Sequence, residues 1–231
     1  MSELVGGIIA AGEGRRLRDA GFAVPKPLVE INGVPLLESV IRNFVAASVR
    51  SIVAIVNAQE AQCVDWARAR FPDLDLRFIV KTTPSSLASF REVVAASAPA
   101  RLLVSTVDAW CRPRDFGAFV AAARRRDADA TVLAVTPLVA DEKPLWTRVG
   151  ADGRVEAVGG AAGTHVTAGI YLVSSAARRR ALASREARLR DFLTALHGTG
   201  EPMWAEVMET VVDVDRAEDV ALAESLAGGD A

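Results

Sequence analysis

The chain has 231 residues, of which 51% are hydrophobic and 24% charged, so it can bury one core, and we expect residues 1–231 to form a single domain. Its 27 basic and 29 acidic residues give a formal charge of −2, which offers no broad basic surface for nucleic acid. No apolar run approaches the roughly 18 residues of a membrane span. No basic segment followed by a long apolar one marks a secretory signal, so we expect a cytoplasmic protein without membrane contact.

The first predicted element is a buried strand at residues 5–10, which is short, apolar and rich in isoleucine. Small residues follow it, and their backbone amides can approach a ligand that a larger side chain would hold away. Such turns form concave groups of N–H donors that suit phosphate oxygens. Arg16 and Lys26 add two cations, and Pro25 and Pro27 restrict the backbone around the lysine. The residues that we expect to bind a nucleotide here are Ala10, Ala11, Gly12, Glu13 and Gly14.

Helical and strand patterns alternate through the rest of the first half. The predicted strands are 51–56, 76–80 and 101–107, and the predicted helices follow residues 35, 60 and 85. This alternation indicates a three-layer α/β/α fold with a mainly parallel, mixed sheet. Because ligands of such folds bind beyond the carboxyl ends of the strands, we expect three loops to line one crevice. These loops are residues 12–26, residues 81–87 and the segment after Val107.

The second half is predicted to be more antiparallel. Strands are indicated at residues 130–136 and 166–173, with a hairpin around Asp152-Gly153 between them. A last strand and helix follow from residue 210 onward. Alternation would place Asp213 and Asp215 on one face of that strand. Asp215 also fits a capping box with Glu218 at the start of the helix.

The segments Ala10–Leu17 and Pro25–Leu28 resemble the signature of the sugar-phosphate nucleotidyltransferase family, Ala-Ala-Gly-x-Gly-x-Arg-Leu followed by Pro-Lys-Pro-Leu. The strand Val166–Val173 resembles the family's Asn-Ala-Gly-Ile-Tyr strand, although Thr167 replaces the asparagine. The resemblance extends over essentially the whole chain. It implies a glycosyltransferase-A-like, Rossmann-like fold. It also implies an Mg²⁺-dependent enzyme that transfers a nucleoside monophosphate from an NTP to a sugar 1-phosphate or similar phosphorylated alcohol, with release of pyrophosphate.

The resemblance also implies roles for individual residues. Arg16 would neutralise the departing pyrophosphate, and Lys26 the α-phosphate in the transition state. Asp108, at the end of the fourth strand, would bind Mg²⁺ together with Asp215 or Asp213. Each role has a simpler alternative, because Arg16 and Lys26 would otherwise be solvated surface charges. Asp108 and Asp215 would otherwise cap the helices that follow them.

Other positions are assigned to the two substrates. Ser85 and Ser86 would contribute to nucleotide binding, and Ser86-Leu87 resembles the branch of the family that uses CTP with phosphocholine or inositol phosphate. Thr167 and Gly169 would line the acceptor pocket. The nucleotide would bind to residues 1–110 and the acceptor to residues 111–231. The family's Glu-Lys-Pro segment is missing after the hairpin, and Glu142-Lys143-Pro144 lies before it.

Three alternatives remain open. A nicotinamide- or flavin-binding oxidoreductase is disfavoured because the loop lacks the third glycine of the dinucleotide fingerprint and the second strand is followed by Asn57, which is not acidic. A non-catalytic binding module on the same fold is the second, since fold does not settle function. A guanylyltransferase that builds the molybdenum dinucleotide cofactor is the third. We expect a monomer or a homodimer.

Overall fold

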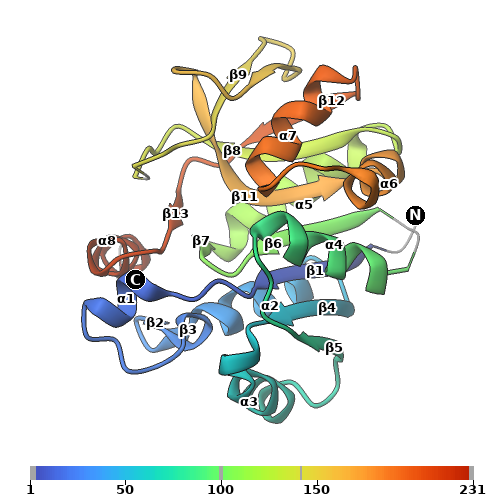
Figure 1. Cartoon of the computed structure of the whole chain (residues 1–231). Coiled ribbons are helices and arrows are strands. Elements are labelled where there is room, and N and C mark those ends of the chain that lie inside the picture. The colour runs from blue at the N-terminus through green and yellow to red at the C-terminus, as the bar shows by residue number, and fades with distance from the viewer. Residues whose placement is uncertain (1–3, 99–100, 141, 229–231) are drawn as a thin grey trace.

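The computed structural model describes residues 4–98, 101–140 and 142–228. Among these residues, nine strands form one mixed sheet, whose main path runs β10-β9-β11-β6-β1-β4-β5, while β8 joins β11 and β12 joins β8 (Figure 1). The strands of this sheet are β1 (Val5–Ala10), β4 (Ser51–Val56), β5 (Asp75–Val80), β6 (Leu102–Thr106), β8 (Thr131–Thr136), β9 (Trp146–Val149), β10 (Val155–Val158), β11 (His165–Val173) and β12 (Met203–Val207).

The first half of the sheet is parallel, with β1 between β4 and β6 and β5 at the outer edge. The direction changes at β11, which is antiparallel to β6, β8 and β9, and β9 and β10 form the predicted hairpin. Strand β12, which pairs with β8, adds a parallel contact in this half. The prediction of a mainly parallel, mixed α/β sheet is therefore confirmed.

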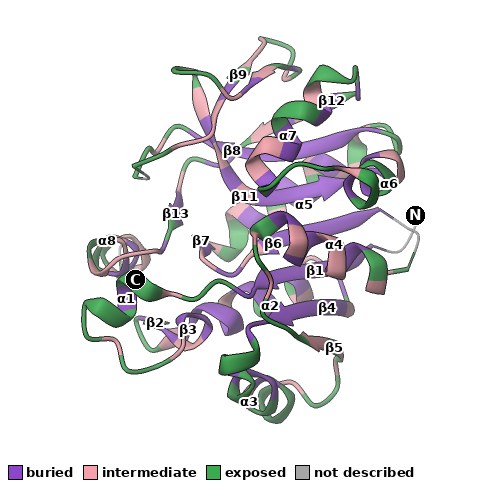
Figure 2. Cartoon of the chain, viewed as in Figure 1, coloured by how far each residue is buried: buried purple, intermediate pink, exposed green. Residues whose placement is uncertain are grey.

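Helices cover both faces of the sheet. They are α1 (Arg15–Asp19), α2 (Leu36–Ala46), α3 (Gln62–Arg70), α4 (Ser86–Ala96), α5 (Pro113–Arg125), α6 (Ser175–Ala183), α7 (Leu189–Gly198) and α8 (Ala217–Ala227). Alternate side chains of β1 point to opposite faces of the sheet. Ile8 packs with α2, α3 and α5 in the core of one face, and Ile9 packs with α4 and α7 in the core of the other. Figure 2 shows the buried strands between these helical layers.

Two short two-stranded sheets lie outside the main sheet. The first pairs β2 (Glu30–Ile31) with β3 (Val34–Pro35). The second pairs β7 (Ala109–Cys111) with β13 (Val211–Asp213), which joins the middle of the chain to its last fifth. Beyond β13 the chain enters α8, which packs against β2 (Figure 1). This second pairing places the C-terminal segment next to the ends of β1 and β6.

Two local predictions about the closing segment are wrong. Asp215 does not form a capping box with Glu218, because the carboxylate of Asp219 accepts the backbone N–H groups of Asp215 and Arg216 at 3.0 and 2.8 Å. Helix α8 begins at Ala217, so Asp219 holds the third helical position and Glu218 the second. Asp213 and Asp215 also do not share a strand face, because β13 ends at Asp213.

Both cysteines, Cys63 and Cys111, are free and buried, as expected from their apolar surroundings. Among the residues that the structure describes, no helix has both the length and the apolar character that crossing a membrane requires.

Candidate active site

The carboxyl ends of β1 and β6 open onto two adjoining cavities. The first, of about 330 Å³, is lined by the loop after β1, by Lys26, by the segment Thr83–Ser86 and by Asp108. The second, of about 260 Å³, is lined mainly by residues of the second half of the chain. The two cavities share Ser86, Thr106 and Asp108, so they meet at the end of β6. The three predicted loops do line one crevice.

Lys26 lies at this junction with 7% of its surface exposed. Its Nζ atom is 2.7 Å from Oδ2 of Asp108 and 2.9 Å from Oδ1 of Asp215. Burial alone would lower the pKa of the ammonium group, but the two carboxylates outweigh burial, and the pKa of Lys26 is raised well above its usual value. Lys26 therefore stays charged and is not a solvated surface residue.

Gly14 makes this position of Lys26 possible. Its φ of +59° lies in the left-handed region, and a Cβ atom there would be 2.8 Å from Cβ of Lys26. The short 3₁₀ helix Lys26–Leu28 begins after Pro25, which fixes the backbone on the other side. Gly14 and Pro25 thus fix the position of Lys26 through local steric constraints on the backbone.

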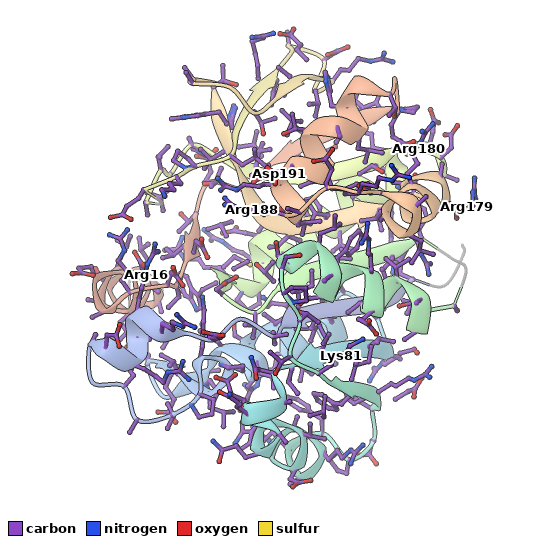
Figure 3. The ribbon with its side chains drawn as sticks, in the orientation of Figure 1. Arg16, Lys81, Arg179, Arg180, Arg188 and Asp191 are labelled. Carbon is purple, nitrogen blue, oxygen red and sulfur yellow. The ribbon has the colours of Figure 1, made fainter. Side chains whose placement is uncertain are left out.

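Arg16, on α1, extends the charge cluster toward solvent. Its Nη1 atom is 2.5 Å from Oδ2 of Asp215, and its side chain is 52% exposed. Figure 3 shows Arg16 between α1 and α8. Asp215 thus accepts hydrogen bonds from two cations. Its burial raises the pKa of the carboxyl group, but Lys26 and Arg16 together outweigh this and lower it.

The lowered pKa of Asp215 predicts how stability depends on pH. A carboxyl group whose pKa falls on folding adds stability above its unfolded pKa of about 3.9, and that contribution is lost as pH falls through the folded pKa. We expect Asp215→Asn to be less stable than the wild type at pH 7, and the gap to narrow as pH falls below about 4. Urea unfolding at a series of pH values measures this. Asp73→Asn, at an exposed site, is the control, and a gap that is constant with pH would contradict the expectation.

Asp108 does not cap the next helix, contrary to the simpler alternative. Helix α5 begins at Pro113 with Arg112 as its N-cap, while the carboxylate of Asp108 pairs with Lys26. The carbonyl oxygen of Asp108 accepts the backbone N–H groups of Trp110 at 2.8 Å and Val214 at 3.0 Å. These bonds join Asp108 to the closing segment and hold Asp215 within reach of the same lysine.

The carboxylates suit a cation that takes only part of its coordination from protein. Oxygens of Asp108 and Asp215 both lie within 2.9 Å of Nζ of Lys26, so the two side chains face the same region where the cavities meet. Asp213 lines the second cavity with Asp108. In the described part of the chain, no group of three His, Cys, Asp or Glu side chains could hold a metal ion. Two hard oxygen donors without a full cage fit Mg²⁺, which keeps waters and binds substrate phosphates.

The remaining residues assigned to the nucleotide line the first cavity or lie at its edge. Ala10 and Ala11 are buried, whereas Gly12 and Glu13 are exposed, and the Glu13 side chain pairs with Arg15. Open space surrounds Gly12, since a Cβ atom there would meet no atom within 4 Å. The two serines have structural partners. Ser85 Oγ accepts the backbone N–H of Ala88 at 3.2 Å and caps α4, and Ser86 Oγ accepts that of Leu189 at 3.2 Å.

Thr167 and Gly169 line the second cavity, as assigned to the acceptor. Gly169 has a φ of +71°, and a Cβ atom there would be 2.6 Å from Oγ1 of Thr106. Only glycine therefore lets β11 pass so close to the end of β6. Tyr171 lines the same cavity, and its burial raises the pKa of the phenol to about 12, so it is a neutral group.

Three charged residues near the cavities were not predicted. Arg188 and Arg190, which flank the start of α7, line the second cavity. Figure 3 shows Arg188 on the segment that leads into α7. Glu142 lies 2.6 Å from Nη2 of Arg216 and 3.8 Å from Nη2 of Arg16, and Pro144 lines the second cavity. The Glu142-Lys143-Pro144 segment therefore reaches the site although it precedes the hairpin. These residues lie in charged segments of the sequence, residues 185–191 and 141–143, so no distinct sequence signal marks them.

Comparison with known proteins gives one curated relative and several similar folds. The chain is 32% identical over 95 residues to the 2-aminoethylphosphonate cytidylyltransferase of Lancefieldella rimae, and this match covers 39% of the chain and 38% of that protein. The chain thus matches well under half the length of this relative.

Solved structures match over nearly the full length. The inositol-1-phosphate CTP transferase of T. maritima aligns with a TM-score of 0.82 and 16% identity over 100% of this chain and 99% of that one. A putative glucose-1-phosphate thymidylyltransferase from Bacillus anthracis aligns with a TM-score of 0.83 and 13% identity over 99% and 96% of the two chains. At these identities the likeness establishes the fold.

Residues 6–200 match the family described as "MobA-like NTP transferase domain". The matched residues include the loop after β1, Lys26, Asp108 and the strand with Gly169. This match covers most of the chain. The chain therefore belongs to the MobA-like NTP transferase domain family.

Proposed function

We propose that the protein is a nucleotidyltransferase that joins the nucleoside monophosphate of an NTP to a small phosphorylated or phosphonate acceptor. An acceptor oxygen attacks the α-phosphorus, the bond between the α- and β-phosphates breaks, and pyrophosphate leaves. The observation that carries this proposal is the position of Lys26, held by Asp108 and Asp215 where two cavities meet. Such a reaction needs two bound anions and a cation between them.

In this proposal the first half of the chain binds the nucleotide. Backbone amides of the loop from Ala10 to Gly14 hold the triphosphate, and the segment with Ser85 and Ser86 contacts the nucleoside. Lys26 stabilises the charge that develops on the α-phosphate, and Arg16 binds the leaving pyrophosphate. Asp108 and Asp215, with Asp213 nearby, would hold Mg²⁺. When bound, this ion neutralises charge on the triphosphate.

The second half of the chain binds the acceptor in the cavity lined by Thr167 and Gly169. Its small volume, about 260 Å³, suits a compact molecule. The cytidylyltransferase and the CTP transferase support CTP as the donor, and the three named activities together support a phosphonate, a polyol phosphate or a sugar 1-phosphate as the acceptor. CTP and a polyol phosphate agree with the substrates of the family branch that Ser86-Leu87 resembles.

A pyrophosphate-release assay tests the proposal. Each of the four NTPs is combined with 2-aminoethylphosphonate, inositol 1-phosphate, phosphocholine, glucose 1-phosphate or molybdopterin, with and without Mg²⁺. We expect turnover with at least one pair, CTP being the favoured donor, and no turnover after chelation. No turnover with any pair would favour the non-catalytic module, and turnover confined to GTP with a molybdopterin acceptor would favour the cofactor guanylyltransferase.

A separate expectation concerns Arg188. The second cavity is lined by the carboxylates of Asp108 and Asp213, so a dianionic acceptor needs cations there, and Arg188 and Arg190 are the arginines that line it. We expect Arg188→Ala to raise the KM of the acceptor about ten- to hundredfold, the effect of losing one charged hydrogen bond, and to leave the KM of the NTP within about twofold. Steady-state kinetics with each substrate varied in turn measures this. Arg185→Ala is the matched control, because Arg185 is exposed on the same segment. An equal rise in both KM values would contradict the assignment.

A further inference from the structure

A third cavity, of about 390 Å³, shares no lining residue with the other two. It lies between the β2–β3 hairpin, α2, β7, the start of α5 and the end of α8, and its wall includes Val34, Asn43, Trp110 and Arg114. Its volume falls in the range of small-molecule sites, about 300–1,000 Å³. The charge cluster around Lys26 belongs to the adjoining pair of cavities, so this third cavity has a chemistry of its own.

Asn43 gives this cavity an unsatisfied polar group. The side chain is only 3% exposed, and its Nδ2 atom donates to Sγ of Cys111 at 3.7 Å. Its Oδ1 atom is buried and has no hydrogen-bond partner. A buried carbonyl oxygen without a partner costs about 1–3 kcal/mol, and native structures rarely contain one without a reason. Because Oδ1 exposes almost no surface, the amide must turn before a ligand in the cavity can donate a hydrogen bond to this atom and remove the cost.

Arginines give the wall a positive charge. Arg42, Arg112 and Arg114 line the cavity, and none of the described lining residues is acidic. Glu38 pairs with Arg42, and Asp115 lies 3.3 Å from Nε of Arg114, so part of this charge is compensated from outside the wall. Arg114 remains 71% exposed and can turn toward a bound anion. A wall with this composition suits an anion that also carries an apolar part.

Apolar side chains complete the wall. Ile31, Val34 and Pro113 lie along it, and Trp110, which is 8% exposed, offers part of its indole. Guanidinium groups are favoured partners of phosphate because they donate paired hydrogen bonds. We propose that this cavity binds a small phosphorylated organic molecule. Its phosphate contacts the arginines, its organic part packs against Trp110 and Val34, and one of its donors binds Oδ1 of Asn43.

The wall is connected directly to the proposed active site. Trp110 and Cys111 belong to β7, which follows Asp108 in sequence, and the backbone N–H of Trp110 donates to the carbonyl of Asp108 at 2.8 Å. Strand β7 pairs with β13, so Ala109 lies opposite Asp213. A ligand against Trp110 thus contacts the two-stranded sheet that positions the carboxylates.

Hydrogen exchange of the full chain tests the proposal with a separate readout for each site. The probes are CMP, inositol 1-phosphate, 2-aminoethylphosphonate and inorganic phosphate. We expect at least one organic probe to slow the exchange of backbone amides in residues 31–43 and 109–114. This protection is read separately from any protection of residues 10–16 and 83–86 around the first cavity. The organic probes distinguish a nucleotide from an acceptor as the source of the phosphate.

Variants assign the protection to the cavity. We expect Asn43→Leu, and separately Arg42→Ala combined with Arg114→Ala, to weaken this binding at least about tenfold, the effect of one charged or buried hydrogen bond. Arg50→Ala, at an exposed site away from the cavity, should bind as the wild type does. The arginine variant changes exposed side chains, so it tests the idea even if Asn43→Leu folds poorly.

Three outcomes would overturn the inference. They are protection by inorganic phosphate alone, no protection of residues 31–43 and 109–114 by any probe, or protection that depends on protein concentration without a probe, which would mean that a second copy of the chain covers the cavity. Each can occur while the first cavity binds nucleotide normally, so failure here is distinct from failure of the proposed function.

Discussion

Lys26→Met should lower the rate of nucleotidyl transfer by at least about a hundredfold, the loss seen when one preorganised electrostatic contact to a transition state is removed. Methionine preserves the length and apolar stem of the side chain, so the change removes the ammonium group and little else. That group lies 2.7 Å from Asp108 and 2.9 Å from Asp215, where the two cavities meet. Single-turnover measurement with saturating NTP and acceptor isolates the chemical step.

The same substitution should destabilise the fold. It leaves two carboxylates near each other without their shared cation, and breaking a fully buried ion pair in this way costs about 3–5 kcal/mol. The side chains of Asp108 and Asp215 are 25% and 37% exposed, so solvent screens part of the repulsion and we expect about 1–3 kcal/mol. Urea unfolding at pH 7 measures the loss.

Lys81→Met is the matched control, since Lys81 is 53% exposed and pairs with Glu92 away from the cavities. Figure 3 shows it on the segment between β5 and α4. It should leave both the rate and the unfolding midpoint near their wild-type values. A Lys26→Met protein that turns over within about threefold of the wild type would remove Lys26 from the mechanism.

Asp108→Asn should also reduce the rate by at least about a hundredfold. Asparagine keeps the shape of the side chain and can still accept a hydrogen bond from Lys26, so the fold is retained while one negative charge is lost. With fewer anionic ligands, the concentration of Mg²⁺ needed for half-maximal rate should rise. Initial rates over a Mg²⁺ series, at fixed NTP and acceptor, give both quantities.

Two further variants distinguish the roles of Asp213 and Asp215. Asp215 shares Lys26 with Asp108, whereas Asp213 lines the second cavity. We therefore expect Asp215→Asn to alter the Mg²⁺ dependence as Asp108→Asn does, and Asp213→Asn to act mainly on the KM of the acceptor. The reverse pattern would assign the metal to Asp213, and unchanged kinetics in Asp108→Asn would exclude that residue from the chemistry.

Several features of the site could be predicted because their causes are local. The strand at residues 5–10, the glycine-rich turn and the Pro25-Lys26-Pro27 segment each depend on the conformations available to a few neighbouring residues. Asp108 could be placed at the end of a strand because the apolar run before it is unambiguous. The parallel sheet then brings such strand ends together, whatever lies between them in sequence.

Other features depend on contacts that no local pattern reveals. The last strand is predicted from residue 210 onward, but β7 has only three residues, too few to show alternation, so its pairing with β13, which brings the closing segment to Asp108, could not be predicted. Arg188 and Glu142 lie in irregular segments, whose course follows from tertiary packing. The capping box is predicted at Asp215 and Glu218 but forms at Arg216 and Asp219, because α8 begins one residue later than the pattern indicates.

The pairing of β7 with β13 also separates the scaffold from the charge cluster along the chain. Residues 5–207 contain every strand of the main sheet, whereas Asp215 and the N–H of Val214 that donates to Asp108 come after them. Removing the residues after 207 would therefore leave the strands of the main sheet in the chain but take from Lys26 one of its two carboxylate partners.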